Sequence, residues 1–252
     1  MTASTTSTNA GTGAWVRRFV PAPDAPHRLV CFPHAGGSAS YFFPVTRALA
    51  PGVDVLAIQY PGRQDRRDEP CVDSVQGLAD ALVEELAAWF DRPVSFFGHS
   101  MGASVAYEVA RRFERRGQVL HGLFVSGRRA PSTVRDERVH LLDDAGLIEE
   151  IRRLSGTDTL VLDDPEILRM ALPSMRADYR AAETYRHVPG PLLSCPLTAL
   201  TGDDDPHVTL DEARAWAEHS AGPFGLEVFP GGHFYLDEQA PALLSALEER
   251  LR

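Results

Sequence analysis

The stretch FFGHSMGASVAYEVARRF, residues 96–113, joins a short apolar run to a longer segment whose apolar residues have helical spacing. The first part predicts a strand that ends at Gly98, and the second predicts a helix that begins near Ser100. Ser100 then occupies a strand-turn-helix with the pattern Gly-x-Ser-x-Gly, the nucleophile elbow. Side chains at positions 98 and 102 would collide with the neighbouring strand and helix, and glycine avoids the collision. The pattern predicts an exposed serine hydroxyl beside a helix N-terminus that can stabilise an oxyanion.

The rest of the chain alternates short apolar runs with longer helical patterns, which predicts an α/β fold. Because the runs are almost continuously apolar, we expect a mostly parallel central sheet with helices on both faces. The expected strands are residues 27–32, 53–60, 94–98, 121–127, 196–202 and 226–231, with an edge strand within 15–20. The expected helices are residues 74–90, 100–116, 209–219 and 238–251, the first with Ser74 as its N-cap.

Composition narrows the classes of function. The chain has 252 residues and a formal net charge of −10, which argues against binding nucleic acid or an anionic membrane through a broad basic surface. Residues 1–13 lack the features of a signal peptide and no later run has membrane-spanning length, so we expect a disordered leader followed by one domain at 14–252. Cys31, Cys71 and Cys195 form no Cys-x-x-Cys pair, which predicts no disulfide framework, no metal site and a cytoplasmic location.

One interval breaks the alternation of strands and helices. Residues 133–190 contain helical patterns and no convincing strand, and they follow an expected strand at the carboxyl edge of the sheet. Insertions at this edge often form a lid over an active site. The alternative is an inserted segment that has only a structural role.

The pattern around Ser100 also occurs in turns without catalytic function, so it needs partners elsewhere in the chain. His233 lies in VFPGGHFYL, directly after the last expected strand and before the last helix. The sequence LTGDDDPHV supplies three aspartates after the preceding strand, which gives the order Ser, Asp, His that this architecture requires. Its spacing in the turn and the proline after it favour Asp205 as the acid, with Asp204 as the alternative and Asp203 facing solvent.

The loop after the first inner strand, residues 31–43, reads CFPHAGGSASYFF. Two glycines and Ala35 allow its backbone to approach a developing oxyanion. The N–H groups of Ala35 and Met101 are therefore the candidate oxyanion hole. Without a nucleophile nearby, the same loop would be an ordinary glycine-rich turn.

Five segments are spread over nearly the whole chain after residue 13: FPHAGGSA (32–39), YPGR (60–63), GHSMGA (98–103), GDDDP (202–206) and FPGGHFYL (229–236). Together they resemble the type II, or editing, thioesterases that accompany modular polyketide and nonribosomal peptide synthases. PHAGG and PGR are more specific than the elbow, which general esterases and lipases share. The resemblance implies an α/β-hydrolase fold and hydrolysis of acyl groups from the phosphopantetheine arm of a carrier protein, without metal or cofactor.

The resemblance also implies roles for individual residues. Ser100, Asp205 and His233 would form the catalytic triad, with Ala35 and Met101 as oxyanion donors. Ser100 would attack the acyl carbonyl, and His233 would protonate the leaving thiol and then activate water. The implied partner is an acyl carrier protein that carries an acyl-phosphopantetheine thioester, and we expect a monomeric enzyme.

Residues 133–190 correspond, by the same resemblance, to the mobile helical lid of the family. Apolar residues of this lid are expected to line an acyl chamber on one side. The candidates for this lining are Leu141, Leu147, Leu168 and Met175.

Two other functions stay open from the sequence: a general carboxylesterase that acts on small free esters, and a non-catalytic binding protein within a synthase assembly. The intact triad disfavours the second. The arginines of QYPGRQDRRDEP, residues 59–70, would suit an acidic carrier protein, but the acidic residues in the same run favour an ordinary solvated loop.

Overall fold

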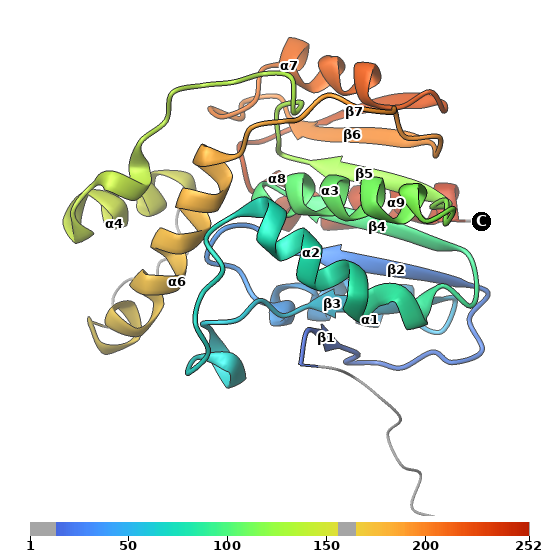
Figure 1. The fold of residues 1–252 in the computed structure, drawn as a ribbon, viewed down its shortest axis with the longest axis horizontal. Coiled ribbons are helices and arrows are strands. Elements are labelled where there is room, and N and C mark those ends of the chain that lie inside the picture. The colour runs from blue at the N-terminus through green and yellow to red at the C-terminus, as the bar shows by residue number, and fades with distance from the viewer. Residues whose placement is uncertain (1–13, 156–164, 252) are drawn as a thin grey trace, which may run out of the picture.

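Seven strands form a single sheet in the computed structural model of the chain, which describes residues 14–155 and 165–251 (Figure 1). The predicted leader at 1–13 lies outside the described residues. The order across the sheet is β1-β3-β2-β4-β5-β6-β7, with β1 antiparallel to β3 and all other neighbours parallel. The predicted α/β fold with a mostly parallel sheet is therefore confirmed. The strands are β1 (Val16–Arg17), β2 (His27–Phe32), β3 (Val53–Ile58), β4 (Val94–His99), β5 (Gly122–Ser126), β6 (Leu197–Gly202) and β7 (Phe224–Phe229).

Helices cover both faces of the sheet because its inner strands bury both of their faces. Every residue of β2 through β6 is buried. Alternate residues of a strand point to opposite sides, so Val30 belongs to the core under α2 and α3, and Leu29 to the core under α1 and α9. The two layers are α2 (Val75–Leu86) with α3 (Met101–Arg115), and α1 (Phe43–Leu49) with α9 (Ala240–Leu251) (Figure 1).

The predicted helices form, with small differences at their ends. Ser74 caps α2, since its Oγ accepts a hydrogen bond from the N–H of Gly77 at 3.2 Å. The segment predicted at 209–219 is α7 (Leu210–Arg214) followed by a 3₁₀ helix (Ala215–His219), and α8 (Tyr235–Glu238) precedes α9. Helix α1 is absent from the prediction because its 7 residues are too few to show a helical period. No helix in the described part of the chain has the length and hydrophobicity that crossing a membrane requires.

The strand predicted at 226–231 is wrong in its bounds, because β7 runs from Phe224 to Phe229. Phe224 pairs with Leu197 at the start of β6, so the strand begins before its apolar run does. Pro230 has no N–H to contribute to the ladder, and the strand ends before it. As an edge strand, β7 is mostly half-buried, which explains why its apolar pattern is weak.

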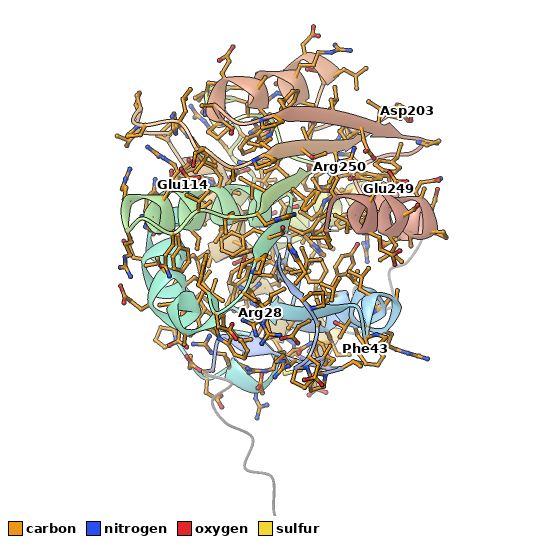
Figure 2. The ribbon with its side chains drawn as sticks, turned by 90° about the vertical axis from the view of Figure 1, so that its right-hand side faces the viewer. Arg28, Phe43, Glu114, Asp203, Glu249 and Arg250 are labelled. Carbon is orange, nitrogen blue, oxygen red and sulfur yellow. The ribbon has the colours of Figure 1, made fainter. Side chains whose placement is uncertain are left out.

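Ion pairs and side-chain contacts hold the amino end of the sheet, away from the inserted helices. Figure 2 looks at this end, with Arg28 in β2 and Glu114 in α3 labelled. Arg28 donates to Asp54 at 3.1 Å and also pairs with Asp91. Glu114 accepts a hydrogen bond from the N–H of Ser194 at 2.9 Å, which ties α3 to the segment before β6. These contacts support the fold from the end opposite the candidate site.

Two buried histidines, His27 and His219, predict that stability falls in mild acid. Burial, assisted by a neighbouring histidine in each case, lowers both pKa values from 6.5 to about 4. The unfolded chain binds these protons below pH 6.5, whereas both histidines of the folded chain stay neutral down to about pH 4. We expect the free energy of unfolding to fall by about 1.4 kcal/mol per pH unit for each histidine within this window.

Urea unfolding at pH values between about 7 and about 5 measures this dependence. The double variant His27→Asn, His219→Asn lacks both titrating groups, so its unfolding free energy should depend less steeply on pH. A slope equal to that of the wild-type protein would contradict the assignment of the effect to these two histidines.

The described residues of the interval 133–190 form helices and no strand, as predicted. They comprise a 3₁₀ turn (Val139–Leu141), α4 (Asp144–Ser155) and α6 (Pro165–Thr184), which lie beyond the carboxyl ends of the strands (Figure 1). The carboxyl half of α6 packs on the main core through Ala181 and Ala182. Its amino half and α4 share a small separate core around Leu147 and Leu172. Among the described residues of the two inserted helices, only the carboxyl half of α6 contributes buried side chains to the main core.

Candidate active site

Ser100 lies at the turn between β4 and α3 in a conformation that few residues adopt. Its φ is 54° and its ψ is −119°, and its N–H donates to the carbonyl oxygen of Ser126 at 2.7 Å. A Cβ atom on Gly98 would lie 2.3 Å from the oxygen of Gly102, and one on Gly102 would lie 2.1 Å from the oxygen of Phe32. Close backbone contacts therefore require both glycines, which confirms the predicted elbow.

We expect Gly102→Val to prevent normal folding. The new side chain would overlap the backbone of β2, which cannot move without disturbing the centre of the sheet. The melting temperature should fall by about 10 °C or more, or the cooperative transition should disappear. Gly225→Val is the matched control, because a Cβ atom there meets Thr198 only at an ordinary 3.7 Å. A wild-type melting temperature for the Gly102→Val protein would contradict the close contact between residue 102 and the backbone of β2.

Three side chains from separate loops meet at the carboxyl edge of the sheet. The Nε2 atom of His233 lies 3.0 Å from Oγ of Ser100, and its Nδ1 atom lies 2.9 Å from Oδ2 of Asp205. With its proton on Nδ1, His233 donates to Asp205 and accepts from Ser100. Asp205 and His233 are both buried, and Oδ1 of Asp205 accepts the N–H of His207 at 2.8 Å. The structure brings together the three residues that the sequence predicts for a triad.

Only one of the three consecutive aspartates points inward. Asp203 and Asp204 are exposed, whereas Asp205 is buried. Oδ1 of Asp203 accepts the N–H of Gly231 at 2.9 Å, and the N–H of Asp204 donates to the carbonyl oxygen of Gly231 at 3.0 Å. These bonds tie the acid turn to the loop that carries His233. Among the described residues, Asp205 alone contacts His233 through a carboxylate.

A second row of polar groups lies beside His233. Nδ1 of His99 lies 2.9 Å from Oγ of Ser126, which lies 2.7 Å from the hydroxyl of Tyr235. The rings of His99 and His233 are 5.0 Å apart. Burial lowers the pKa of His99 well below its usual value, so its ring stays neutral next to His233. This row is not predicted from the sequence; Ser126, a polar residue that ends an apolar strand, is the signal that could have indicated it.

The two candidate oxyanion donors come from the turn that carries Ser100 and from the loop after β2. Met101 is the first residue of α3, and Ala35 lines the same pocket as Ser100. Within residues 14–155 and 165–251, neither of their N–H groups donates a hydrogen bond to another residue. Unpaired N–H groups at these positions meet the first requirement of an oxyanion hole.

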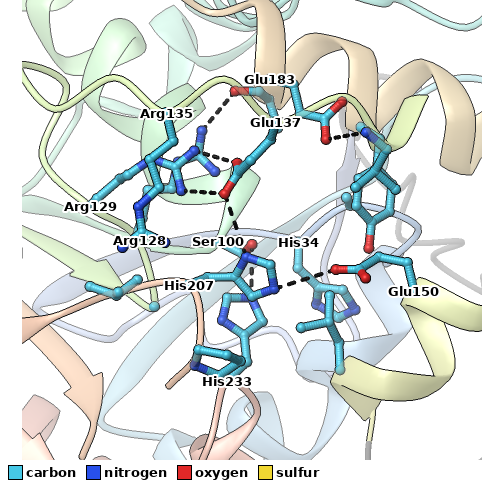
Figure 3. Close-up of a pocket in the computed structure, with 18 of the residues that line it drawn as sticks. His34, Ser100, Arg128, Arg129, Arg135, Glu137, Glu150, Glu183, His207 and His233 are labelled. Atoms are coloured by element: carbon cyan, nitrogen blue, oxygen red, sulfur yellow. Dashed lines mark hydrogen bonds and ion pairs between the residues drawn. The ribbon is translucent and has the colours of Figure 1, made fainter. Parts of the chain in front are cut away.

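Ser100 and His233 open into a pocket with a volume of about 360 Å³ (Figure 3). One wall is charged: Arg129 forms an ion pair with Glu137, whose carboxylate lies 3.8 Å from Nδ1 of His207. Burial opposes ionisation of Glu137, but His207 and Arg129 hold its pKa below the usual range. His207 is thus part of the pocket wall, although the sequence did not indicate it. Nowhere in the described chain is a group of three or more His, Cys, Asp or Glu side chains arranged to hold a metal ion.

The four apolar residues predicted to line an acyl chamber do not reach this pocket. Leu147 and Met175 are buried in the small core between α4 and α6, and Leu168 packs against that core. Leu141 is 67% exposed. The expectation fails because the apolar faces of α4 and α6 pack against each other. The pocket is lined instead by charged residues together with other apolar ones, such as Val139, Leu154 and Phe234.

The arginines of residues 59–70 do not form a free basic surface. Arg63 is buried against Asp178 of α6, and Arg66 is buried against Glu69. Arg67 is exposed. Most of the charge in this run therefore stabilises the protein itself, and one of its arginines reaches the inserted block.

A family model of the thioesterase domain matches residues 27–251. The chain belongs to the thioesterase domain family. This thioesterase is similar to thioesterase PikA5 of Streptomyces venezuelae, with 53% identity over 245 residues that cover 96% of this chain and 87% of that protein. The family match extends from β2 to α9 and includes all three residues at the carboxyl edge of the sheet.

Two solved structures resemble this thioesterase over most of its length. The type II thioesterase BorB from the borrelidin biosynthetic cluster matches with a TM-score of 0.92 and 55% identity, over 97% of this chain and 100% of that chain. The RedJ thioesterase from the prodiginine pathway of Streptomyces coelicolor matches with a TM-score of 0.85 and 40% identity, over 90% and 87%. The resemblance to type II thioesterases and the expected hydrolase activity on thioesters are thereby confirmed.

Proposed function

We propose that this thioesterase hydrolyses acyl groups from the phosphopantetheine arm of acyl or peptidyl carrier proteins, in an editing role during polyketide or nonribosomal peptide synthesis. The observation that carries the proposal is the hydrogen-bonded line from Asp205 through His233 to Ser100, at 2.9 and 3.0 Å, beside the pocket. The similarity to the type II thioesterase BorB, from a biosynthetic cluster, supports this class of substrate.

Ser100 begins the reaction as the nucleophile. His233 takes the proton from Oγ as that oxygen attacks the thioester carbonyl carbon, and Asp205 orients the imidazole and stabilises its positive charge. The N–H groups of Ala35 and Met101 donate to the oxyanion of the tetrahedral intermediate. The carbon–sulfur bond then breaks, and His233 gives its proton to the departing thiolate. An acyl ester remains on Ser100.

Water completes the cycle through the same residues. His233 takes a proton from a water molecule, whose oxygen attacks the ester carbon, and the second intermediate collapses with return of that proton to Ser100. One thioester and one water are thereby converted into one carboxylic acid and one thiol. These steps call for no metal or cofactor.

The proposal is tested with two substrates that share one acyl group: an acetyl thioester on a carrier protein and a simple acetyl oxygen ester. We expect kcat/KM to be higher by about a hundredfold or more for the carrier thioester, because contacts with the arm and carrier contribute binding energy. Faster turnover of the oxygen ester would indicate a general carboxylesterase. Absence of turnover on both substrates would indicate a non-catalytic binding protein.

We propose further that α4 and the amino half of α6 form a lid that moves over the pocket. Their small core is separate from the main core, and α4 contributes Glu150 and Arg153 to the pocket lining. Pro173 interrupts the hydrogen-bond ladder within α6, between the two halves. Hydrogen exchange should be faster in α4 than in β4, and slower in α4 after binding of a non-hydrolysable acyl-pantetheine analogue. Core-like protection of α4 in both states would identify a fixed structural element instead.

The cytoplasm is the proposed location of this thioesterase. Its cysteines Cys31, Cys71 and Cys195 are all free. Free thiols persist in a reducing compartment, whereas oxidising compartments favour their pairing.

A further inference from the structure

The loop that carries Ala35 is held by a side chain from the inserted block. Oδ2 of Asp178, on α6, accepts a hydrogen bond from the N–H of Gly36 at 2.8 Å, across 142 residues of sequence. This N–H belongs to the planar peptide group directly after Ala35, so the bond restricts rotation of the backbone at Ala35. Asp178 is only 1% exposed, and its carboxylate is therefore committed to this contact rather than to water.

Arg63 completes the contact from the body of the protein. Its guanidinium donates to both carboxylate oxygens of Asp178, at 2.6 and 2.8 Å, and to the carbonyl oxygen of Gly37 at 2.9 Å. Burial of both side chains shields this ion pair from screening by salt. The ion pair thus fixes one backbone group of Gly36 and one of Gly37.

These two glycines make the loop flexible unless something holds it. Gly36 has a φ of 77°, and glycine adopts positive and negative φ values with similar ease. An oxyanion donor is most effective when it is already oriented before the charge develops, because no reorganisation is then needed during the reaction. The buried carboxylate of Asp178, which accepts one hydrogen bond from Gly36 and two from Arg63, supplies this orientation beside Ala35.

We propose that Asp178 and Arg63 are positioning residues, which hold the N–H of Ala35 in place as an oxyanion donor. The inference rests on the proposed function, in which Ala35 serves the hydrolysis of a thioester. Because Asp178 belongs to α6, the oxyanion hole is complete only while this part of the inserted block is docked against the loop. The arginine of the YPGR segment thereby gains a role in the reaction without touching the substrate.

Three variants test the inference. Asp178→Ala removes both contacts, and Asp178→Asn keeps one oxygen acceptor while it loses the charge. Arg180→Gln is the matched control, because Arg180 lies on the same helix and forms an exposed ion pair with Asp73 at 3.0 Å. Thermal melting first establishes that each variant is folded.

The measurements separate binding from transition-state stabilisation. We determine kcat and KM on the acetyl carrier-protein thioester, and Kd for two pantetheine analogues. A trifluoromethyl ketone forms a tetrahedral oxyanion adduct with the serine, whereas a thioether has no electrophilic carbon and forms none. Loss of an oxyanion donor weakens the first analogue selectively.

For Asp178→Ala we expect kcat to fall by about 10²-fold, with KM changed by less than about threefold. Affinity for the trifluoromethyl ketone should fall with kcat, while affinity for the thioether should stay the same. Asp178→Asn should show the same selectivity with a loss of about tenfold, and Arg180→Gln should behave as wild type. If the Asp178→Ala protein does not fold, the same measurements on Asp178→Asn test the inference.

Wild-type kcat in a folded Asp178 variant would overturn the inference. Equal losses of affinity for both analogues would also overturn it, because they would indicate general disruption of the inserted block. Failure of the proposed function is seen separately, in the wild-type protein, which would then neither hydrolyse the carrier thioester nor bind the trifluoromethyl ketone more tightly than the thioether.

Discussion

Replacing Ser100 with alanine is expected to remove nearly all thioesterase activity and to leave the fold intact. Oγ of Ser100 makes a hydrogen bond to His233 at 3.0 Å and adds little packing, whereas in the proposed mechanism it forms the covalent bond to the acyl group. We expect kcat/KM on a carrier thioester to fall by roughly 10⁴-fold or more. Steady-state kinetics and a melting curve on the same preparation measure both expectations.

Ser245→Ala is the matched control for this substitution, because Ser245 is exposed on α9. It should retain wild-type activity and stability. Alanine at position 100 keeps a Cβ atom in the same backbone conformation, so its melting temperature should stay within about 4 °C of wild type. Undiminished turnover by the Ser100→Ala protein would rule out Ser100 as the nucleophile.

Asp205→Asn is expected to lower turnover by about 10³ to 10⁴-fold while the protein stays folded. The amide can no longer stabilise the imidazolium, and its N–H₂ group favours the wrong tautomer of His233. Its oxygen can still accept the N–H of His207, which preserves the turn. Kinetics on the carrier thioester, with circular dichroism as the check on folding, measure the effect.

The neighbouring aspartates provide the controls for this prediction. Asp203→Asn and Asp204→Asn should each lower turnover by less than roughly tenfold, because both carboxylates are exposed and their charges are screened by water and salt. Asp203→Asn also keeps an oxygen that can accept the N–H of Gly231. A large loss of turnover in Asp204→Asn together with a small loss in Asp205→Asn would contradict the assignment of Asp205 as the acid of the triad.

The elbow and its partners could be predicted because their constraints are local in the sequence. A Cβ atom at Gly98 or Gly102 would lie 2.3 or 2.1 Å from a backbone oxygen, so no side chain fits at either position. The two glycines in the sequence therefore indicate the turn. The inward direction of Asp205 follows from the short turn after β6, where three adjacent carboxylates cannot all be buried without repulsion. The α/β class and the approximate positions of the strands along the chain followed from the alternation of apolar runs with helical patterns.

The inserted block could not be predicted to the same depth. An apolar residue such as Leu147 gives the same sequence signal whether it lines a cavity or packs against another helix. Arg63 and Asp178 are separated by 115 residues, and no local pattern connects them. The sequence did not indicate His207, because the carboxylates that lie beside it in the pocket, those of Glu137 and Glu150, come from distant parts of the chain.

Stoichiometric labelling with an alkyl fluorophosphonate tests the central claim, a serine thioesterase acting through Ser100, most directly. Peptide mass spectrometry locates the phosphonylated residue, and turnover of the acetyl carrier thioester is measured at each extent of labelling. We predict one labelled residue, Ser100, and a loss of turnover in proportion to its labelling. Full turnover by protein that is completely labelled at Ser100, or loss of turnover with label only at another residue, would contradict the account.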